Sequence, residues 1–190
     1  AMGMDVLDIN NDGLEDVIEL DMNPEDNFRK KMMLNPLNYS RYINNDQFDY
    51  QYQYVRNMLH LNRGMKVTED SSYPQPVFSE IGFLAGIAET DWSWAPVVTD
   101  FDQDGYRDII ITNGFPKDVT DHDFMAYRHK SSMLTSKREL LDMLPKVKIA
   151  NYAFKNQGDL TFSNKTVEWG LDIPTFSNAA AYADFDNDGD

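Results

Sequence analysis

Three short acidic stretches combine the residue types and the spacing of a metal-binding loop. They begin at Asp8, Asp100 and Asp184, and each places an oxygen-bearing side chain at its first, third and fifth positions and glycine at its sixth. Alternate side chains of a tightly curled loop can point to one centre, and glycine permits the sharp turn. The ninth position is aspartate in the first two stretches, whereas the sequence ends at position seven of the third, at Asp190.

The donor atoms favour calcium over other metals. Calcium takes about 6–8 oxygen ligands, whereas the small, strict octahedron of magnesium suits a cage of so many protein oxygens poorly. Histidine and cysteine are absent from all three stretches, which argues against zinc. The alternative is an acidic turn without a metal, because Asp, Asn and Gly favour turns. Three copies in register favour calcium loops over such turns.

The flanking residues predict strands on both sides of each loop. Loop one fits an EF-hand with Glu19 at position twelve, but loop two has Ile111 there and lacks the bidentate carboxylate. β-Branched runs flank loop two at residues 97–99 and 109–112, and apolar pairs frame loop one in the same way. Such runs are typical of strands rather than of EF-hand helices. We therefore expect each loop to join two β-strands.

Composition restricts the class of protein. The 190 residues include 17 basic and 32 acidic side chains, a net charge of −15, and twelve of the acids lie in the three loops. Three bound calcium ions would reduce the net charge to about −9. This balance argues against nucleic acid as a partner, because phosphate binding needs a basic patch. The 42% apolar content predicts a folded core, and no apolar run of about 18 residues predicts a membrane span.

Cysteine and the chain ends bear on the cellular setting. No cysteine is present, which excludes disulfides and thiol catalysis. No export signal begins the sequence, but its end inside loop three leads us to expect a fragment of a longer protein. Weak calcium sites suit the calcium-rich extracellular setting. We therefore expect an extracellular or outer-membrane surface location.

The sequence repeats itself at a spacing of 84 residues. Residues 76–112 form the clearest unit, and the shift overlays them on residues 160–188, so that Gly86 meets Gly170. A repeat with fixed turns and a cation loop predicts a supersecondary unit that stacks on copies of itself. We expect one domain, 1–190, with repeat units at about 1–27, 48–116 and 150–190 and insertions at about 28–47 and 117–149.

The segments between the loops predict one short helix, a tyrosine-rich strand and a helical pair. We expect a helix at Phe28–Leu34. The alternating aromatic residues at 48–54 suit a strand or one face of a helix, and we favour a strand, which includes the segment 57–64 that ends in a turn signal. We expect the tyrosines to pack in the core rather than to form a ligand platform. Thr120 and Asp123 predict the start of one helix in the second insertion. Ser136 and Glu139 form the capping box of another helix, which Pro145 ends.

These features together resemble the FG-GAP/VCBS repeat, the blade of integrin-α-type β-propellers. The similarity covers nearly the whole chain and is strongest at the three loops. A bacterial branch of the family, which is common in Bacteroidetes and related to the cartilage acidic protein family, is similar at the following stretches: Phe78-Ser79-Glu80-Ile81, Thr90-Asp91-Trp92-Ser93-Trp94-Ala95-Pro96 and Asn151-Tyr152-Ala153-Phe154-Lys155-Asn156.

The resemblance implies a mainly β fold, a partial β-propeller of antiparallel FG-GAP/VCBS blades with helical insertions. A complete member has seven four-stranded blades, with calcium at a loop between two strands of a blade. Loops 92 and 84 residues apart are longer than a plain blade, so the insertions are large. The implied calcium ligands are the side chains of Asp8, Asn10, Asp12, Asp16, Asp100, Asp102, Asp104, Asp108, Asp184, Asp186 and Asp188 and the carbonyls of Leu14, Tyr106 and Asp190.

The function that this resemblance implies is binding or adhesion by an exported or cell-surface protein, with calcium in a structural role. The ligand would be a protein or a carbohydrate. The alternative is a propeller-based polysaccharide lyase or hydrolase. Its candidate residues would be His122, Asp123, Arg128 and His129 on the second insertion, or Asp91 beside Trp92 and Trp94. No catalytic motif is found, so we do not expect an enzyme.

Overall fold

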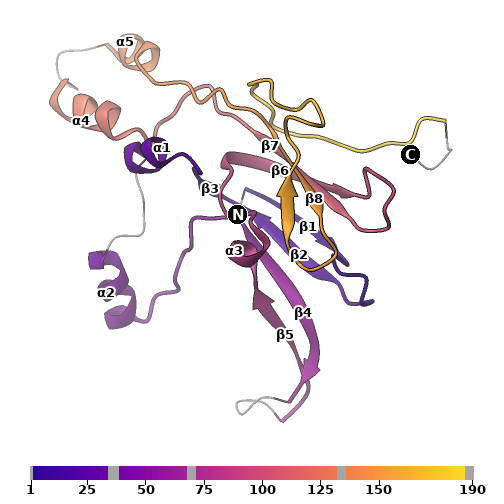
Figure 1. Cartoon of the computed structure of the whole chain (residues 1–190). Helices are drawn as coiled ribbons and strands as arrows, with labels where there is room; N and C mark the ends of the chain where they lie inside the picture. Colours follow the sequence, from indigo (N-terminus) through magenta and orange to yellow (C-terminus); the bar gives the residue numbers. More distant parts are fainter. Residues whose placement is uncertain (1, 34–38, 68–71, 132–135, 187–190) are drawn as a thin grey trace.

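Two antiparallel β-sheets form the body of the molecule, and several short helices lie outside them (Figure 1). A computed structural model describes residues 2–33, 39–67, 72–131 and 136–186 of the chain. The expected mainly β class is confirmed. Among the described helices, none is long and apolar enough to cross a membrane.

The first sheet is a four-stranded meander with loop one between its first two strands. Its strands are β1 (Gly3–Leu7), β2 (Asp16–Leu20), β4 (Met58–Lys66) and β5 (Gln75–Glu80), in the spatial order β1-β2-β4-β5. Val6 lies opposite Val17, so the predicted strands on both sides of loop one are confirmed.

The second sheet repeats this arrangement and adds a short strand at one edge. Its strands are β3 (Met22–Asn23), β6 (Asp91–Thr99), β7 (Asp108–Asn113), β8 (Tyr152–Asn156) and β9 (Phe162–Asn164), in the order β3-β6-β7-β8-β9. Val98 lies opposite Ile109, which confirms the strands around loop two. Each sheet therefore contains four consecutive antiparallel strands with an acidic loop between the first and the second.

One apolar cluster joins the two sheets. It contains Ile18 and Leu59 from the first sheet and Ile109 and Ile111 from the second, all fully buried. Side chains alternate between the faces of a strand, so residues two apart point to the same side. Burial of each such side chain contributes about 1.5–3 kcal/mol to folding.

The turns that precede loops two and three have the same backbone hydrogen bonds at positions 84 residues apart. Gly86 N–H donates to the carbonyl of Phe83, and Gly170 N–H donates to that of Val167, both at 3.2 Å. The two glycines have positive φ angles of 80° and 71°. The first turn includes the short helix α3 (Gly82–Ala85).

The first insertion contains two helices where we expected one. Helix α1 (Asn27–Met32) lies at the predicted position, except that Leu34 is outside the described residues. Helix α2 (Tyr39–Phe48) was missed, and it lies apart from both sheets in Figure 1. The expected strand in the segment 57–64 is confirmed as β4, but its extension into the tyrosine run is wrong, because residues 50–55 form no strand. Tyr50 and Tyr54 are exposed, so the expected core packing is wrong there as well.

The second insertion forms the predicted helical pair, α4 (His122–Ser131) and α5 (Lys137–Asp142). The predicted start of α4 was one residue off, because Asp121 rather than Thr120 accepts the N–H of Phe124 at 2.8 Å. The capping box of Ser136 and Glu139 is confirmed, with both reciprocal hydrogen bonds present.

Candidate metal centres

The first aspartate of each described loop holds the turn by accepting two backbone hydrogen bonds. Asp100 accepts from the N–H groups of Asp104 and Gly105, at 3.0 and 2.8 Å. Asp8 accepts from the corresponding residues of loop one, at 3.1 and 2.9 Å. The chain can curl in this way because the fourth and sixth positions of both loops have positive φ angles, 59° at Gln103 and 93° at Gly105 in loop two.

The aspartate at position nine of loops one and two is fully buried and ties the loop to a neighbouring strand. Asp108 accepts from the N–H groups of Phe101, at 3.1 Å, and Asn156, at 2.9 Å. Asp16 accepts in the same way from Ile9 and Asn62, at 3.0 and 2.7 Å. Burial, which removes water from the charged form, raises the pKa of both carboxyls above the ordinary value.

Loop two brings three carboxylates to one point. Asp100, Asp102 and Asp108 each offer an oxygen, and these oxygens lie within 4.8 Å of one another. In loop one the third position is Asn10, whose amide donates to Asp12 at 3.0 Å. Both loops offer only oxygen atoms at the predicted side-chain positions, which is the chemistry that calcium prefers.

A lysine from the second sheet already places a positive charge against loop two. The ammonium of Lys155 contacts the carboxylates of Asp102 and Asp104, the latter at 2.8 Å. Its hydrogen bond lowers the pKa of Asp104, and the two carboxylates raise the pKa of Lys155. The carboxylates of loop two therefore already bind one cationic group, and a metal ion would compete with this ammonium for the same oxygens.

The two loops lie side by side and are joined by hydrogen bonds. The amide of Asn11 donates to the carbonyl of Gly105 at 2.8 Å. The Arg107 guanidinium donates to the carbonyl of Asp8 at 2.6 Å. The Asn156 side chain donates to carbonyls in both loops. The conformation of one loop therefore depends on that of the other.

The remaining predicted ligands are placed less completely. Leu14 and Tyr106 occupy position seven of their loops. Each donates its backbone N–H to the aspartate at position five, Asp12 or Asp104, at 2.9 Å. In loop three, Asp184 and Asp186 are described and follow residues 176–183, which form no strand. Asp188 and Asp190 lie outside the described residues.

The candidate residues for an enzyme fall into two groups. His122, Asp123, Arg128 and His129 are exposed on α4. Asp91 is buried and pairs with Arg29, and Trp92 stacks on Phe115 with 4.5 Å between the ring centroids. Trp92 is 5% exposed and packs in the core, so it offers little surface for a sugar ring.

Two asparagines that support the loops were missed as site residues. Asn62 and Asn156 occupy equivalent places in the two sheets, and each also accepts an N–H from the glycine two residues later, at 2.9 Å. The signal was the Asn-x-Gly pattern that the sequence repeats at Asn62 and Asn156, on the third strand of each meander. In comparisons with known proteins, the chain matches no family model, no curated protein and no solved structure.

Proposed function

We propose that this chain is a calcium-braced segment of a β-propeller from an exported or cell-surface binding protein. The observation that carries the proposal is the convergence of Asp100, Asp102 and Asp108 in a loop between two strands. Three carboxylates so close together repel one another, and one of them is fully buried. A divalent cation would relieve both the repulsion and the cost of burying charge.

The propeller is the arrangement that best accommodates two similar sheets in succession. Each sheet contains a four-stranded antiparallel meander, and the acidic loop occurs at the same place in both. Stacked copies of such a unit bury a continuous core, as the shared apolar cluster does here. The resemblance to FG-GAP/VCBS repeats supports the same arrangement, with a protein or a carbohydrate as the ligand.

Calcium in this proposal is structural. Asp8, Asn10, Asp12 and Asp16 would hold one ion in loop one. Asp100, Asp102, Asp104 and Asp108 would hold another in loop two, each together with carbonyl oxygens. A ligand that binds the folded state at 100 times its Kd stabilises it by about 2.7 kcal/mol. For a chain of this size we expect calcium to raise Tm by roughly 5–10 °C relative to chelator.

Calcium titration by calorimetry and thermal melts with calcium or chelator test the proposal. Asp102→Ala and Asp104→Ala should lower calcium affinity and remove much of the calcium-dependent rise in Tm. Lys155→Met should increase calcium affinity, because it removes the competing ammonium. Asp142→Asn, which changes an exposed acid at the end of α5, is the matched control and should leave the rise intact. Equal melting of the unaltered chain in calcium and chelator would refute the proposal.

A further inference from the structure

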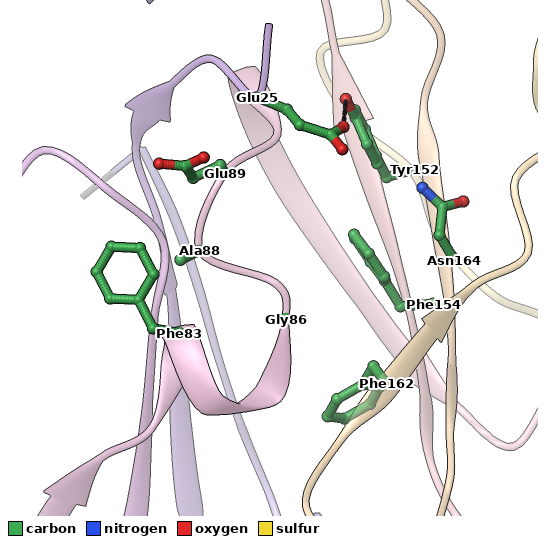
Figure 2. Close-up of a pocket in the computed structure, with 9 residues that line it drawn as sticks. All are labelled: Glu25, Phe83, Gly86, Ala88, Glu89, Tyr152, Phe154, Phe162 and Asn164. Atoms are coloured by element: carbon green, nitrogen blue, oxygen red, sulfur yellow. Dashed lines mark hydrogen bonds between the residues drawn. The ribbon is translucent and has the colours of Figure 1, made fainter. Parts of the chain in front are cut away.

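Two adjoining cavities form a groove beside the start of the first insertion. The smaller has a volume of about 270 Å³ and the larger about 540 Å³, and Glu25, Tyr152 and Asn164 line both. Figure 2 shows the smaller cavity, between the turn at Gly86 and Ala88 on one side and strands β8 and β9 on the other. The larger volume is in the range of small-molecule sites, roughly 300–1,000 Å³.

One wall of the groove is aromatic. The rings of Tyr152 and Phe154 are nearly parallel, with centroids 5.7 Å apart and an angle of 13° between their planes. The ring of Phe162 lies beyond Phe154 on the same wall (Figure 2). Backbone and a small side chain form the facing wall at Gly86 and Ala88. The opening is therefore a slot that presents aromatic surface to its contents.

The groove carries surplus negative charge. Four acids and one base line the two cavities: Glu25, Asp26, Glu89, Asp91 and Arg29. Arg29 is already shared between Asp91, at 3.0 Å, and the fully buried Asp118, at 2.8 Å. Glu89 is neutralised by Lys30 at 2.6 Å. The groove would repel an anion. Among the described residues, a neutral ligand would leave the carboxylates of Glu25 and Asp26 without a counter-charge.

Glu25 is the carboxylate placed to meet a ligand. Its Oε2 accepts the hydroxyl of Tyr152 at 2.9 Å, across the mouth of the smaller cavity (Figure 2). Within the part of the chain that the structure describes, Oε1 of Glu25 accepts no hydrogen bond. Burial and the facing carboxylate raise the pKa of Tyr152, so its hydroxyl remains a donor at neutral pH. Glu25 is therefore held beside the aromatic wall with one oxygen available.

We propose that this groove binds a small organic cation with an ammonium or guanidinium group on a short chain. The cationic group would lie against Glu25 and the face of Tyr152, and the apolar chain against the partly exposed ring of Phe162, because Phe154 is only 4% exposed. Cations bind the faces of aromatic rings through the ring quadrupole, and a carboxylate beside the ring adds direct attraction. The inference goes beyond the proposed function, whose ligand would be a protein or a carbohydrate, and assigns the groove a second, small-molecule ligand.

Calorimetry with matched cationic and neutral probes tests this inference at saturating calcium. The probes are agmatine, choline and 3,3-dimethylbutan-1-ol, the neutral carbon isostere of choline. We expect the two cations to bind and the neutral alcohol to bind at least about tenfold more weakly. The affinity should fall with added salt, because screening weakens the attraction between charges. Equal affinity for choline and the alcohol would overturn the proposal.

Glu25→Gln is the decisive variant, because glutamine keeps the size and can still accept the hydroxyl of Tyr152. It should weaken agmatine binding roughly tenfold, since it removes the charge beside the ligand. Glu19→Gln changes an acid on β2 that lines neither cavity and is the matched control, with unchanged binding. Tyr152→Phe keeps the ring and should retain cation binding within about threefold. Unchanged agmatine binding by Glu25→Gln would also overturn the proposal.

The calcium melts keep the two proposals separable. Glu25→Gln should show the full calcium-dependent rise in Tm, which establishes that the variant is folded. Loss of cation binding with an intact calcium response assigns the effect to the groove. A chain that binds the cations but melts equally in calcium and chelator would refute the metal proposal and leave the groove standing.

Discussion

Asn156 connects the two acidic loops through one buried side chain. Its amide donates to the carbonyl of Ile9 at 2.9 Å and to that of Arg107 at 3.1 Å. Its backbone N–H donates to Asp108, and its side-chain oxygen accepts from Gly158. The side chain is 2% exposed, so water cannot readily replace these partners. A single residue therefore holds both loops against strand β8.

Replacement of this asparagine should cost much more stability than replacement of its neighbour. Asn156→Ala leaves two carbonyls without their donor, and each unsatisfied buried group costs about 1–3 kcal/mol. We expect the free energy of unfolding to fall by roughly 2–4 kcal/mol in urea denaturation. Gln157→Ala, at an exposed position, should change it by less than about 0.5 kcal/mol. Similar losses for the two variants would contradict the bridging role of Asn156.

Local spacing predicts the loops, whereas their support comes from distant residues. The aspartates and glycine lie within nine residues, so the sequence shows the turn and its acidic side chains directly. Asp16 and Asp108 each accept one hydrogen bond from within the loop and one from a distant residue, Asn62 or Asn156, which is 46 or 48 residues away. Only the pairing of β4 with β2 and of β8 with β7 brings them close. A pattern within one loop could not identify them.

At the scale of elements, Arg29 attaches both insertions to the second sheet. It lies on α1 and pairs through Nη2 and Nε with Asp91, at the start of β6. Its Nη1 pairs with Asp118, which precedes α4 and is fully buried. Figure 1 shows α1 and α4 on the same side of the sheets. One guanidinium thus joins three elements that are far apart in the sequence.

Loss of the Arg29 guanidinium should therefore destabilise the whole chain. Arg29→Met leaves Asp118 and Asp91 without a counter-charge, and breaking a buried ion pair in this way costs about 3–5 kcal/mol. Arg29→Lys keeps the charge but cannot make the bidentate contact, so we expect a smaller loss.

Urea denaturation of both variants measures the two losses, and the exposed neighbour provides a control. Lys31→Met removes a positive charge from the same helix and should have little effect. If Arg29→Met and Lys31→Met unfold at the same urea concentration, Arg29 does not hold the insertions.

The helices show where local pattern succeeds and where it fails. The Ser136 and Glu139 box predicted α5 because capping depends on residues three apart. Helix α2 has no buried residue, so no apolar stripe revealed it. The alternating tyrosines that follow α2 suited a strand, but among the residues that the structure describes no strand pairs with residues 50–55. A strand needs such a partner, which a local pattern cannot supply.

At the scale of the whole molecule, the two sheets approach each other closely where Gly3 on β1 meets Trp94 on β6. A Cβ atom on Gly3 would overlap the backbone carbonyl oxygen of Trp94 and would lie 3.0 Å from Cδ of Pro96. Neither atom is at the end of a flexible side chain, so neither can move away without a shift of β6. The sequence does not reveal this contact, because the glycine is required by a strand of the other sheet rather than by a turn of its own.

Gly3→Ala tests whether the sheets depend on this close approach. A single methyl group would have to push β1 and β6 apart, and overpacking of this kind costs about 1–3 kcal/mol or more. Gly170→Ala is the comparison, because its φ of 71° strains any side chain although no atom lies within 4 Å of the added Cβ. That strain alone costs roughly 1 kcal/mol.

The two variants separate contact between the sheets from strain within a turn. Gly3→Ala should lower Tm more than Gly170→Ala, and it should also weaken calcium binding, because loop one follows β1 directly while loop two follows β6. Gly170→Ala should leave calcium affinity unchanged, since Gly170 lies outside both loops. If Gly3→Ala lowers Tm no more than Gly170→Ala does, the contact between Gly3 and β6 does not hold the two sheets together. The hydrogen bonds between the two loops would then be what positions them.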